Sequence, residues 1–114
     1  MRFLLLLRDD AEAAAALSPD ERRAIVGEHL AFRAALKERG ALVAAEALTA
    51  VDRWATVRPG TTPLVTDGPF AETREQLGAL YLIDCADRDE ALALAARAPR
   101  SPGLTVEVLP TVPT

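Results

Sequence analysis

The sequence predicts an α+β fold in which a strand-helix-strand unit is followed by a second one. Short apolar runs, which are typical of strands, recur along the chain at 2–7, 42–48, 78–85 and 104–109. Two longer segments between them, 18–39 and 87–98, carry capping signals and apolar residues at helical spacing. With 114 residues, we expect a single domain, 1–114, around one hydrophobic core.

The first strand is the opening apolar run, and a loop is expected to lead from it into the first helix. Ser18 is the expected N-cap, Pro19 the first helical residue, and Glu21 the partner that completes a capping box. The helix is expected to run to Arg39, with Gly40 as its stop. Its apolar stripe consists of Ile25, Phe32 and Leu36, supported by Val26 and Leu30.

The middle of the chain predicts a hairpin inserted between two strands. After the strand at 42–48, residues 52–58 form a strand, and Pro59-Gly60 turns the chain into a short strand around Leu64-Val65. The strand at 78–85 follows. The hairpin therefore lies outside the two strand-helix-strand units.

The second helix is expected to begin at Asp87, with Glu90 three residues later, and to end before Pro99. The last strand covers 104–109, and the tail 110–114 is expected to fray. Without the hairpin, the order is β-α-β followed by β-α-β, which is the ferredoxin-like arrangement.

Two helices can cover only one face of such a sheet, yet its central strands have two apolar faces. Residues 3–7 and 80–83 are apolar throughout, whereas a strand with one wet face alternates. A second copy, packed sheet against sheet, would cover the open face, so we expect a homodimer. The alternative is a monomer in which the hairpin carrying Trp54 folds over that face.

Composition excludes several classes of function. A net charge of −4 without a basic run argues against nucleic acid and anionic membranes, and no apolar segment reaches the ~20 residues of a membrane span. We expect a cytoplasmic protein. One His, one Cys and two Ser make a zinc site or a Ser-His-Asp triad improbable, and no glycine-rich nucleotide loop is present, so no metal or cofactor is expected. The single Cys85 excludes an intrachain disulfide.

The segment 65–78, Val-Thr-Asp-Gly-Pro-Phe-Ala-Glu-Thr-Arg-Glu-Gln-Leu-Gly, with Tyr81-Leu82-Ile83-Asp84 behind it, resembles the DGPF-motif proteins of the YCII-related superfamily. The resemblance extends over nearly the whole chain. It implies a small dimeric α+β barrel, often encoded beside extracytoplasmic-function sigma factors. Some relatives in the wider superfamily are enzymes of chlorinated-aromatic breakdown that use a His-Asp pair. One departure is Arg74, which stands where many members have Lys.

His29 is the main candidate for chemistry. It lies four residues after Ile25 and three before Phe32, so it belongs to the buried stripe of the first helix and faces the sheet. The resemblance implies that this helix position supplies the His of the pair. A desolvated imidazole beside a carboxylate can move a proton near neutral pH. The alternative is a hydrogen-bonded core histidine.

The carboxylate that orients His29 is expected to be Asp67 or Asp84. We favour Asp67, because its turn lies within the strongest motif. The alternative for Asp67 is a turn in which the carboxylate holds backbone N–H groups two residues on. For Asp84 the alternative is a cap or loop anchor.

The motif and the strand behind it also predict a site for a small organic ligand. Its expected residues are Gly68, Pro69, Phe70, Glu72, Glu75 and Tyr81. A solvated, salt-bridged turn is the alternative for the two glutamates. Phe70 is expected to plug the core beneath the turn or to line a pocket, and Tyr81 to line the cavity or simply to pack.

Three functions follow from these patterns. The first is a cofactor-free enzyme in which His29, held by Asp67, moves a proton on a small organic substrate in an isomerisation or elimination. The second is a non-catalytic ligand-binding or regulatory protein, linked to a sigma factor. The third is a dimeric shell without chemistry.

Overall fold

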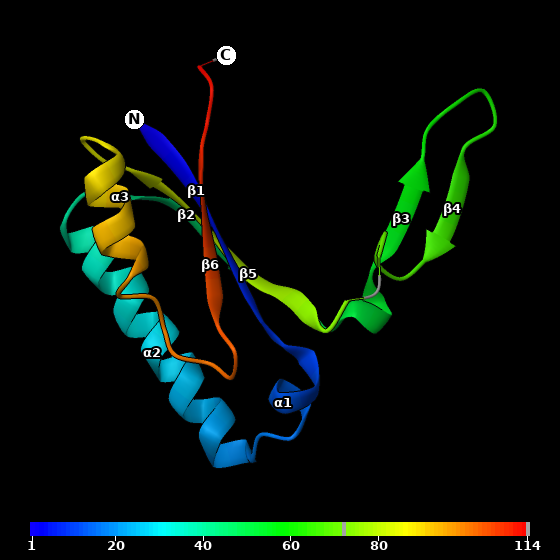
Figure 1. Cartoon of the computed structure of the whole chain (residues 1–114), viewed down its shortest axis with the longest axis horizontal. Coiled ribbons are helices and arrows are strands. Elements are labelled where there is room, and N and C mark those ends of the chain that lie inside the picture. Colours follow the sequence, from blue (N-terminus) through cyan, green and yellow to red (C-terminus); the bar gives the residue numbers. More distant parts are fainter. Residues whose placement is uncertain (72, 114) are drawn as a thin grey trace.

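The computed structural model describes residues 1–71 and 73–113 and contains a four-stranded antiparallel sheet with α2 and α3 on one face (Figure 1). The strand order is β2-β5-β1-β6. These strands are β1 (Arg2–Asp10), β2 (Leu42–Ala47), β5 (Glu75–Asp84) and β6 (Thr105–Pro110). The first unit contributes β1 and β2, and the second contributes β5 and β6, so the strands of the two units alternate across the sheet. The predicted ferredoxin-like α+β fold is confirmed.

The long helix α2 (Pro19–Glu38) begins and ends where the sequence predicts. The Ser18 hydroxyl accepts a hydrogen bond from the Glu21 N–H, and the Glu21 carboxylate accepts one from the Ser18 N–H. This reciprocal capping box satisfies two backbone donors at the helix start. Gly40, with φ of 72°, follows the C-cap Arg39 in the left-handed conformation that glycine adopts without strain.

Two shorter helices complete the chain. Helix α3 (Arg88–Ala95) begins after Asp87, whose carboxylate accepts a hydrogen bond from the Glu90 N–H. The short helix α1 (Ala11–Ala15) occupies the segment where only a loop was expected. It begins because the Asp10 carboxylate accepts hydrogen bonds from two N–H groups of its first turn.

The hydrophobic core lies between the sheet and the helices. Alternate residues of β1 point toward it, and Phe3, Leu5 and Leu7 are buried. The helices and the other strands contribute Phe32, Leu36, Ala45, Ala79, Tyr81, Ile83, Ala91 and Leu94. Burying one large apolar side chain stabilises the fold by about 1.5–3 kcal/mol. The prediction that Val26 and Leu30 belong to the buried stripe of this helix is wrong, because these residues are 58% and 63% exposed.

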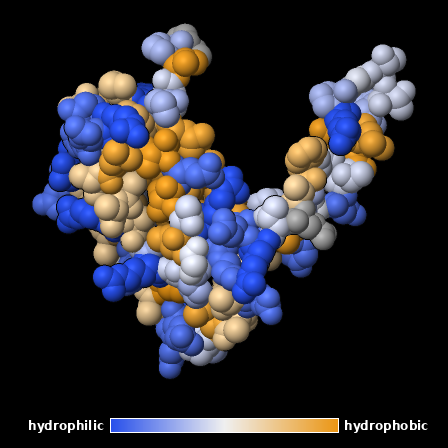
Figure 2. All heavy atoms as spheres, in the orientation of Figure 1, coloured by the Kyte–Doolittle hydropathy of each residue, from blue (hydrophilic) through white to orange (hydrophobic). Residues whose placement is uncertain are grey.

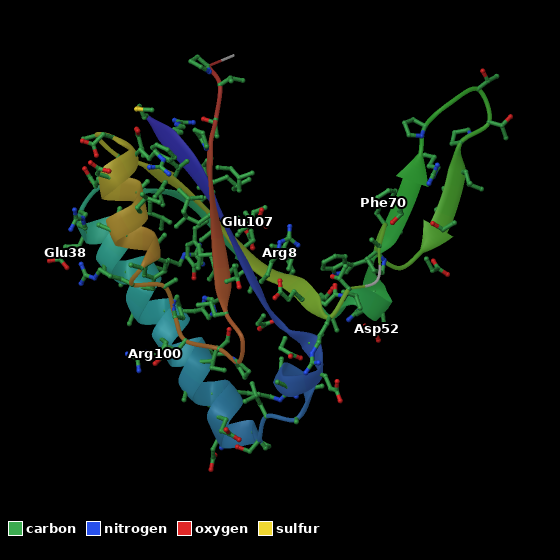
Figure 3. All side chains as sticks on the ribbon, viewed as in Figure 1. Arg8, Glu38, Asp52, Phe70, Arg100 and Glu107 are labelled. Carbon is green, nitrogen blue, oxygen red and sulfur yellow. The ribbon has the colours of Figure 1, made fainter. Side chains whose placement is uncertain are left out.

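The other residues of the central strands form the opposite face of the sheet, which no helix covers. In the register, Leu4 lies opposite Leu82 on β5 and Leu109 on β6, and Leu6 lies opposite Leu80. We call these five leucines the outer face. An ion pair between Arg8 and Glu107, with 2.6 Å between Nε and Oε1, joins β1 to β6 (Figure 3).

The inserted segment forms a hairpin that extends away from the body of the molecule (Figure 1). It consists of the 3₁₀ helix η1 (Val51–Arg53) and the strands β3 (Ala55–Arg58) and β4 (Leu64–Asp67). The strand expected at 52–58 is therefore shorter, and η1 replaces its first part. The Trp54 indole donates a hydrogen bond to the Thr49 carbonyl (3.0 Å) and so ties the hairpin base. The alternative in which the hairpin covers the sheet is wrong.

Candidate active site

A cavity of about 420 Å³ lies between α2, β5 and the end of β1. Three polar groups that can exchange or share protons line it, namely Asp9, His29 and Ser101. Its other walls are mostly apolar and include Leu7, Ile25, Val26, Leu48, Ala79 and Leu104, with Arg22 beside them. We call this cavity the His29 pocket. Mostly apolar walls with a few convergent polar groups are typical of sites for small molecules.

The carboxylate of Asp9 reaches this pocket because β1 is longer than the apolar run suggested. Alternation along β1 places Asp9 on the same face as Leu7. The pairing of β1 with β5 shifts between Leu7 and Arg8, which lie opposite Ala79 and Leu77. Gly78 is thus the extra residue of a β-bulge.

Gly78 keeps space open beside this carboxylate. A Cβ atom at Gly78 would lie 3.8 Å from each carboxylate oxygen of Asp9. Any side chain there would therefore contact Asp9 and reduce the exposure of its charge. The bulge and the missing side chain together form one wall of the pocket.

The surroundings of Asp9 favour its protonated form. Burial raises the pKa of this carboxyl, because charge is costly in a medium of low polarity. A hydrogen bond from the Ser101 side chain lowers the pKa in part, and the neighbouring Asp10 charge raises it again. The charge of His29 acts on the same carboxyl and lowers its pKa.

His29 is held by the hydroxyl of Tyr81. Its Nδ1 lies 2.6 Å from the Tyr81 oxygen, and the two rings are parallel within 3° at a centroid distance of 6.0 Å. Phe32 packs edge-to-face on Tyr81 with a centroid distance of 5.0 Å. Tyr81 is a residue of β5 and only 4% exposed, so its ring and hydroxyl are fixed against α2. The structure thus brings two of the predicted site residues together.

Burial acts on both rings and favours their neutral forms. It lowers the pKa of His29, while the charges of Glu28 and Asp9 raise it in part. Burial also raises the pKa of the Tyr81 hydroxyl. At neutral pH the cluster therefore holds a neutral imidazole and a protonated phenol.

The two carboxylates predicted to orient His29 lie elsewhere. Asp67 ends β4, where it is exposed and pairs with Ala55 on the hairpin. The Asp84 carboxylate lies 3.3 Å from the N-terminal amine of Met1. Within the protomer, the charges of Glu28, the stronger, and Asp9 both act on the imidazole, and of these two carboxylates only Asp9 lines the cavity beside His29. The pairing of His29 with Asp67 stays a prediction.

The motif that dominated the sequence lies at the base of the hairpin. Gly68, with φ of 94°, makes the turn and donates its N–H to the Trp54 carbonyl at 2.7 Å. Phe70 does not plug the core as expected, because its side chain is 79% exposed (Figure 3). The Arg58 guanidinium lies 6.0 Å from the centre of its ring, which is a cation–π distance.

The remaining ligand-binding residues of the prediction are spread over this region. Pro69 is half-buried behind Gly68, and Glu75 is exposed at the start of β5. Glu72 lies outside the described residues. A ligand site formed by these residues therefore stays a prediction.

The sequence contained a signal for Asp9 that its polarity obscured. Buried positions recur at Phe3, Leu5 and Leu7, and the next position in this period of two is residue 9. Ser101 had no such signal, because it lies in the segment between α3 and β6 and reaches the pocket only through the fold.

Residues 1–71 and 73–113 contain no group of three or more His, Cys, Asp or Glu side chains placed to bind a metal ion. In the same ranges, no helix has the length and apolar character needed to cross a membrane. Burial raises the pKa of the Cys85 thiol, and the charge of Glu90 raises it further, which disfavours the reactive thiolate.

Comparison with known families shows to which of them the chain belongs. The model of the YCII-related domain matches residues 1–111 of the chain. The chain belongs to the YCII-related family. This YCII-related protein is 39% identical over 97 residues to the uncharacterized protein R00369 of Rhizobium meliloti (strain 1021). The matched region covers 83% of the present chain and 77% of that relative.

Proposed function

We propose that this YCII-related protein catalyses proton transfer on a small carbonyl compound, with Asp9 and His29 as the catalytic residues. The observation that carries the proposal is a half-buried carboxylate of raised pKa in the same cavity as an imidazole of lowered pKa. Burial moves the pKa of Asp9 up toward neutral pH, which suits a base. Burial also keeps His29 neutral at that pH, so that its N–H can donate a hydrogen bond. Three polar groups in mostly apolar walls suit a small, largely apolar substrate.

The contact with Tyr81 assigns a tautomer to His29. A buried phenol needs an acceptor for its O–H, and Nδ1 of His29 is 2.6 Å away. A neutral imidazole that accepts at Nδ1 carries its proton on Nε2. We infer that the pocket receives this Nε2–H group as a hydrogen-bond donor. Tyr81 then acts as a positioning residue.

These states define a proton-transfer step. The Asp9 carboxylate removes a proton from a carbon next to the substrate carbonyl, and the electron pair of the C–H bond forms an enolate. The His29 Nε2–H donates to the enolate oxygen, where the negative charge develops. Return of the proton from Asp9 to a different carbon gives the isomer, and its return to the same carbon restores the substrate.

Exchange of substrate hydrogen for deuterium tests this step without knowledge of the product. In D₂O, wild-type protein is expected to introduce deuterium next to the carbonyl of at least one member of a panel of small cyclic ketones and lactones, followed by proton NMR. His29→Gln keeps an acceptor for the Tyr81 hydroxyl but offers the enolate oxygen only an amide N–H, which is a weaker acid than the imidazole N–H. It is expected to slow the exchange by roughly 10²–10⁴-fold, the usual contribution of an acid or base.

The matched control is Asp52→Asn, which removes an exposed carboxylate on η1 (Figure 3) that does not line the pocket. It is expected to exchange at the wild-type rate. Equal rates in wild type and His29→Gln would exclude His29 from the step.

We also propose that the protein forms a homodimer through the outer face. No helix lies over the five leucines of this face, and the hairpin does not cover them (Figure 1). Four of them are half-buried and Leu109 is exposed. A contiguous apolar patch that solvent can reach is typical of an interface. A second copy provides an identical and complementary face, as in other isologous pairs.

The extended hairpin supports the same proposal. Its strands pair only with each other, and an isolated two-stranded hairpin is marginally stable in water. Several of its apolar side chains are exposed (Figure 2), including Val57, Leu64, Val65 and Phe70. The radius of gyration is 15.7 Å, whereas a compact chain of this length has about 13 Å. A partner protomer in contact with the hairpin would cover its exposed apolar side chains, and it explains why the hairpin extends away from its own protomer.

The regulatory alternative rests on the sequence resemblance alone. Association with an extracytoplasmic-function sigma factor therefore stays a prediction. Co-purification of the two proteins is its test.

A further inference from the structure

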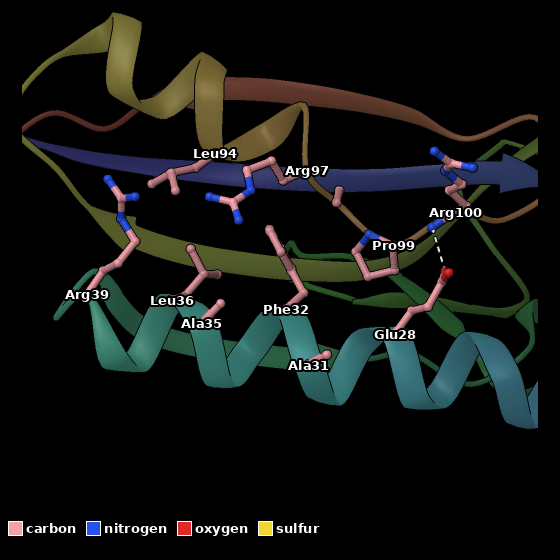
Figure 4. A pocket seen from close by; sticks show the side chains of 11 residues that line it. Glu28, Ala31, Phe32, Ala35, Leu36, Arg39, Leu94, Arg97, Pro99 and Arg100 are labelled. Carbon is pink, nitrogen blue, oxygen red and sulfur yellow. Dashed lines mark hydrogen bonds between the residues drawn. The ribbon is translucent and has the colours of Figure 1, made fainter.

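We propose that a second cavity, between α2 and α3, binds a small organic anion with an apolar body. This groove has a volume of about 310 Å³ and opens on the helical side of the molecule (Figure 4). Five of the residues that line the groove are expected to bind the ligand, namely Phe32, Leu36, Leu94, Arg39 and Arg97. The groove lies on the side of the sheet opposite the outer face, so a dimer through the outer face leaves it accessible.

The charge of the groove is concentrated at one end. Arg39 is the C-cap of α2, and Arg97 follows the C-cap of α3. In Figure 4 both guanidinium groups point into the space between the two helices, whereas that of Arg100 points away. Helix C-termini favour a cation, which accounts for an arginine at each end but not for the convergence of the two groups. Two converging positive charges repel each other, and an anion between them removes this repulsion.

The carboxylates near the groove leave this end positive. Arg39 is paired with Glu90 at 3.7 Å, a long contact with one carboxylate oxygen. The Glu28 carboxylate lies at the other end of the groove and accepts the backbone N–H of Arg100 at 3.0 Å. No ion pair within 4.0 Å joins Arg97 to a carboxylate in the described residues. This local positive charge contrasts with the net charge of −4 of the whole chain.

The floor of the groove is apolar and fits the apolar body of the ligand. Phe32, Leu36 and Leu94 are nearly buried and present an apolar surface, and the exposed Ala31 and Ala35 leave room above it. A volume of 310 Å³ is at the lower end of the range for small-molecule sites. The chemistry that fits is therefore a carboxylate or phosphate group, which guanidinium binds in a bidentate manner, on a short aliphatic or aromatic body.

Octanoate, octyl phosphate and 1-octanol, used below the concentrations at which micelles form, test this site. Titrations followed by ¹H–¹⁵N NMR are expected to show saturable binding of one or both anions, with the amide shifts of Ala31, Ala35 and Ala98 changing together. The anion that binds more tightly, octanoate or octyl phosphate, shows whether the site prefers a carboxylate or a phosphate. Octanol is expected to bind at least fivefold more weakly, because it lacks the charge.

Variants separate the two halves of the site. Arg97→Gln and Arg39→Gln are each expected to weaken anion binding roughly fivefold, as for partly exposed ion pairs. Arg53→Gln, on η1, is the charge control and should bind as wild type. Ala35→Phe fills the groove and should abolish binding, whereas Ala34→Phe, on α2 but outside the groove, should not.

Three results would overturn the proposal. They are octanol binding as tightly as the anions, affinity unchanged in Arg97→Gln and Arg39→Gln, and shifts confined to the His29 pocket around Ala47 and Ala79. None of them bears on deuterium exchange by Asp9 and His29, so this site and the proposed function fail independently.

Discussion

Asp9→Asn is expected to lower activity and raise stability at the same time. Loss of the base should slow deuterium exchange by roughly 10²–10⁴-fold. The folded state no longer holds a half-buried charge, so the melting temperature at pH 7 should rise by a few degrees, since ~1 kcal/mol shifts it by ~4–8 °C in a small domain. Asn is nearly isosteric and still accepts a hydrogen bond from Ser101.

The stability gain should depend on pH in a defined direction. Because the pKa of Asp9 is raised above 3.8 in the folded protein, the folded state binds more protons than the unfolded state just above that pH. The contribution of Asp9 to the free energy of unfolding of the wild type therefore falls as the pH rises from 3.8 through the pKa of Asp9 in the folded protein. The difference between Asp9→Asn and wild type should be largest at neutral pH and vanish below pH 3.8. A variant that is less stable at pH 7, beside an unchanged Asp52→Asn control, would contradict the assignment.

Leu82→Asp is expected to convert the proposed homodimer into a monomer. Leu82 lies on the central strand β5, opposite Leu4 on β1 and Ala44 on β2. In a monomer its carboxylate would face water, but in the dimer two such charges would be buried without partners, at about 3–5 kcal/mol or more. The dissociation constant should therefore rise by at least ~10²-fold, as measured by sedimentation equilibrium.

The control for this prediction is Leu92→Asp on α3, where Leu92 is 38% exposed on the helical side. Wild type and this control should sediment at twice 12.2 kDa, and Leu82→Asp at 12.2 kDa. Phe70→Ser should weaken the dimer less, because it removes only a hairpin contact. A wild-type protein that stays at 12.2 kDa at all concentrations argues against the outer-face dimer.

Much of the fold follows from local rules that act within a few residues. Ser18, Glu21 and Gly40 fix both ends of α2, and Asp87 fixes the start of α3, because capping needs only neighbours in sequence. The apolar runs likewise identify the four strands of the sheet. The α+β architecture could therefore be predicted from these rules, whereas the family was predicted from the resemblance of the motif at 65–78.

The candidate site depended on long-range pairing and could be predicted only in part. His29 was predicted from helix spacing, and Tyr81 was predicted from the strand behind the motif. Their hydrogen bond depends on how α2 packs on β5. Asp67 was favoured because it lies in the most specific motif, yet that motif turns the chain at the hairpin base. Asp9 was expected in the loop after the first strand, and its place beside Gly78 follows from a bulge that single-sequence patterns do not reveal.

The most direct test of the central claim is the titration of His29 by ¹⁵N NMR in wild type, Asp9→Asn and Tyr81→Phe. His29 is the only histidine in the chain, so its two nitrogen signals need no residue assignment, and their couplings to the ring protons distinguish Nδ1 from Nε2. We predict the Nε2–H tautomer with a pKa below 6.5 in wild type. The pKa should fall further in Asp9→Asn, which loses a favourable charge, and the tautomer preference should weaken in Tyr81→Phe. An Nδ1–H tautomer, or a pKa that does not respond to Asp9→Asn, would contradict the coupled site.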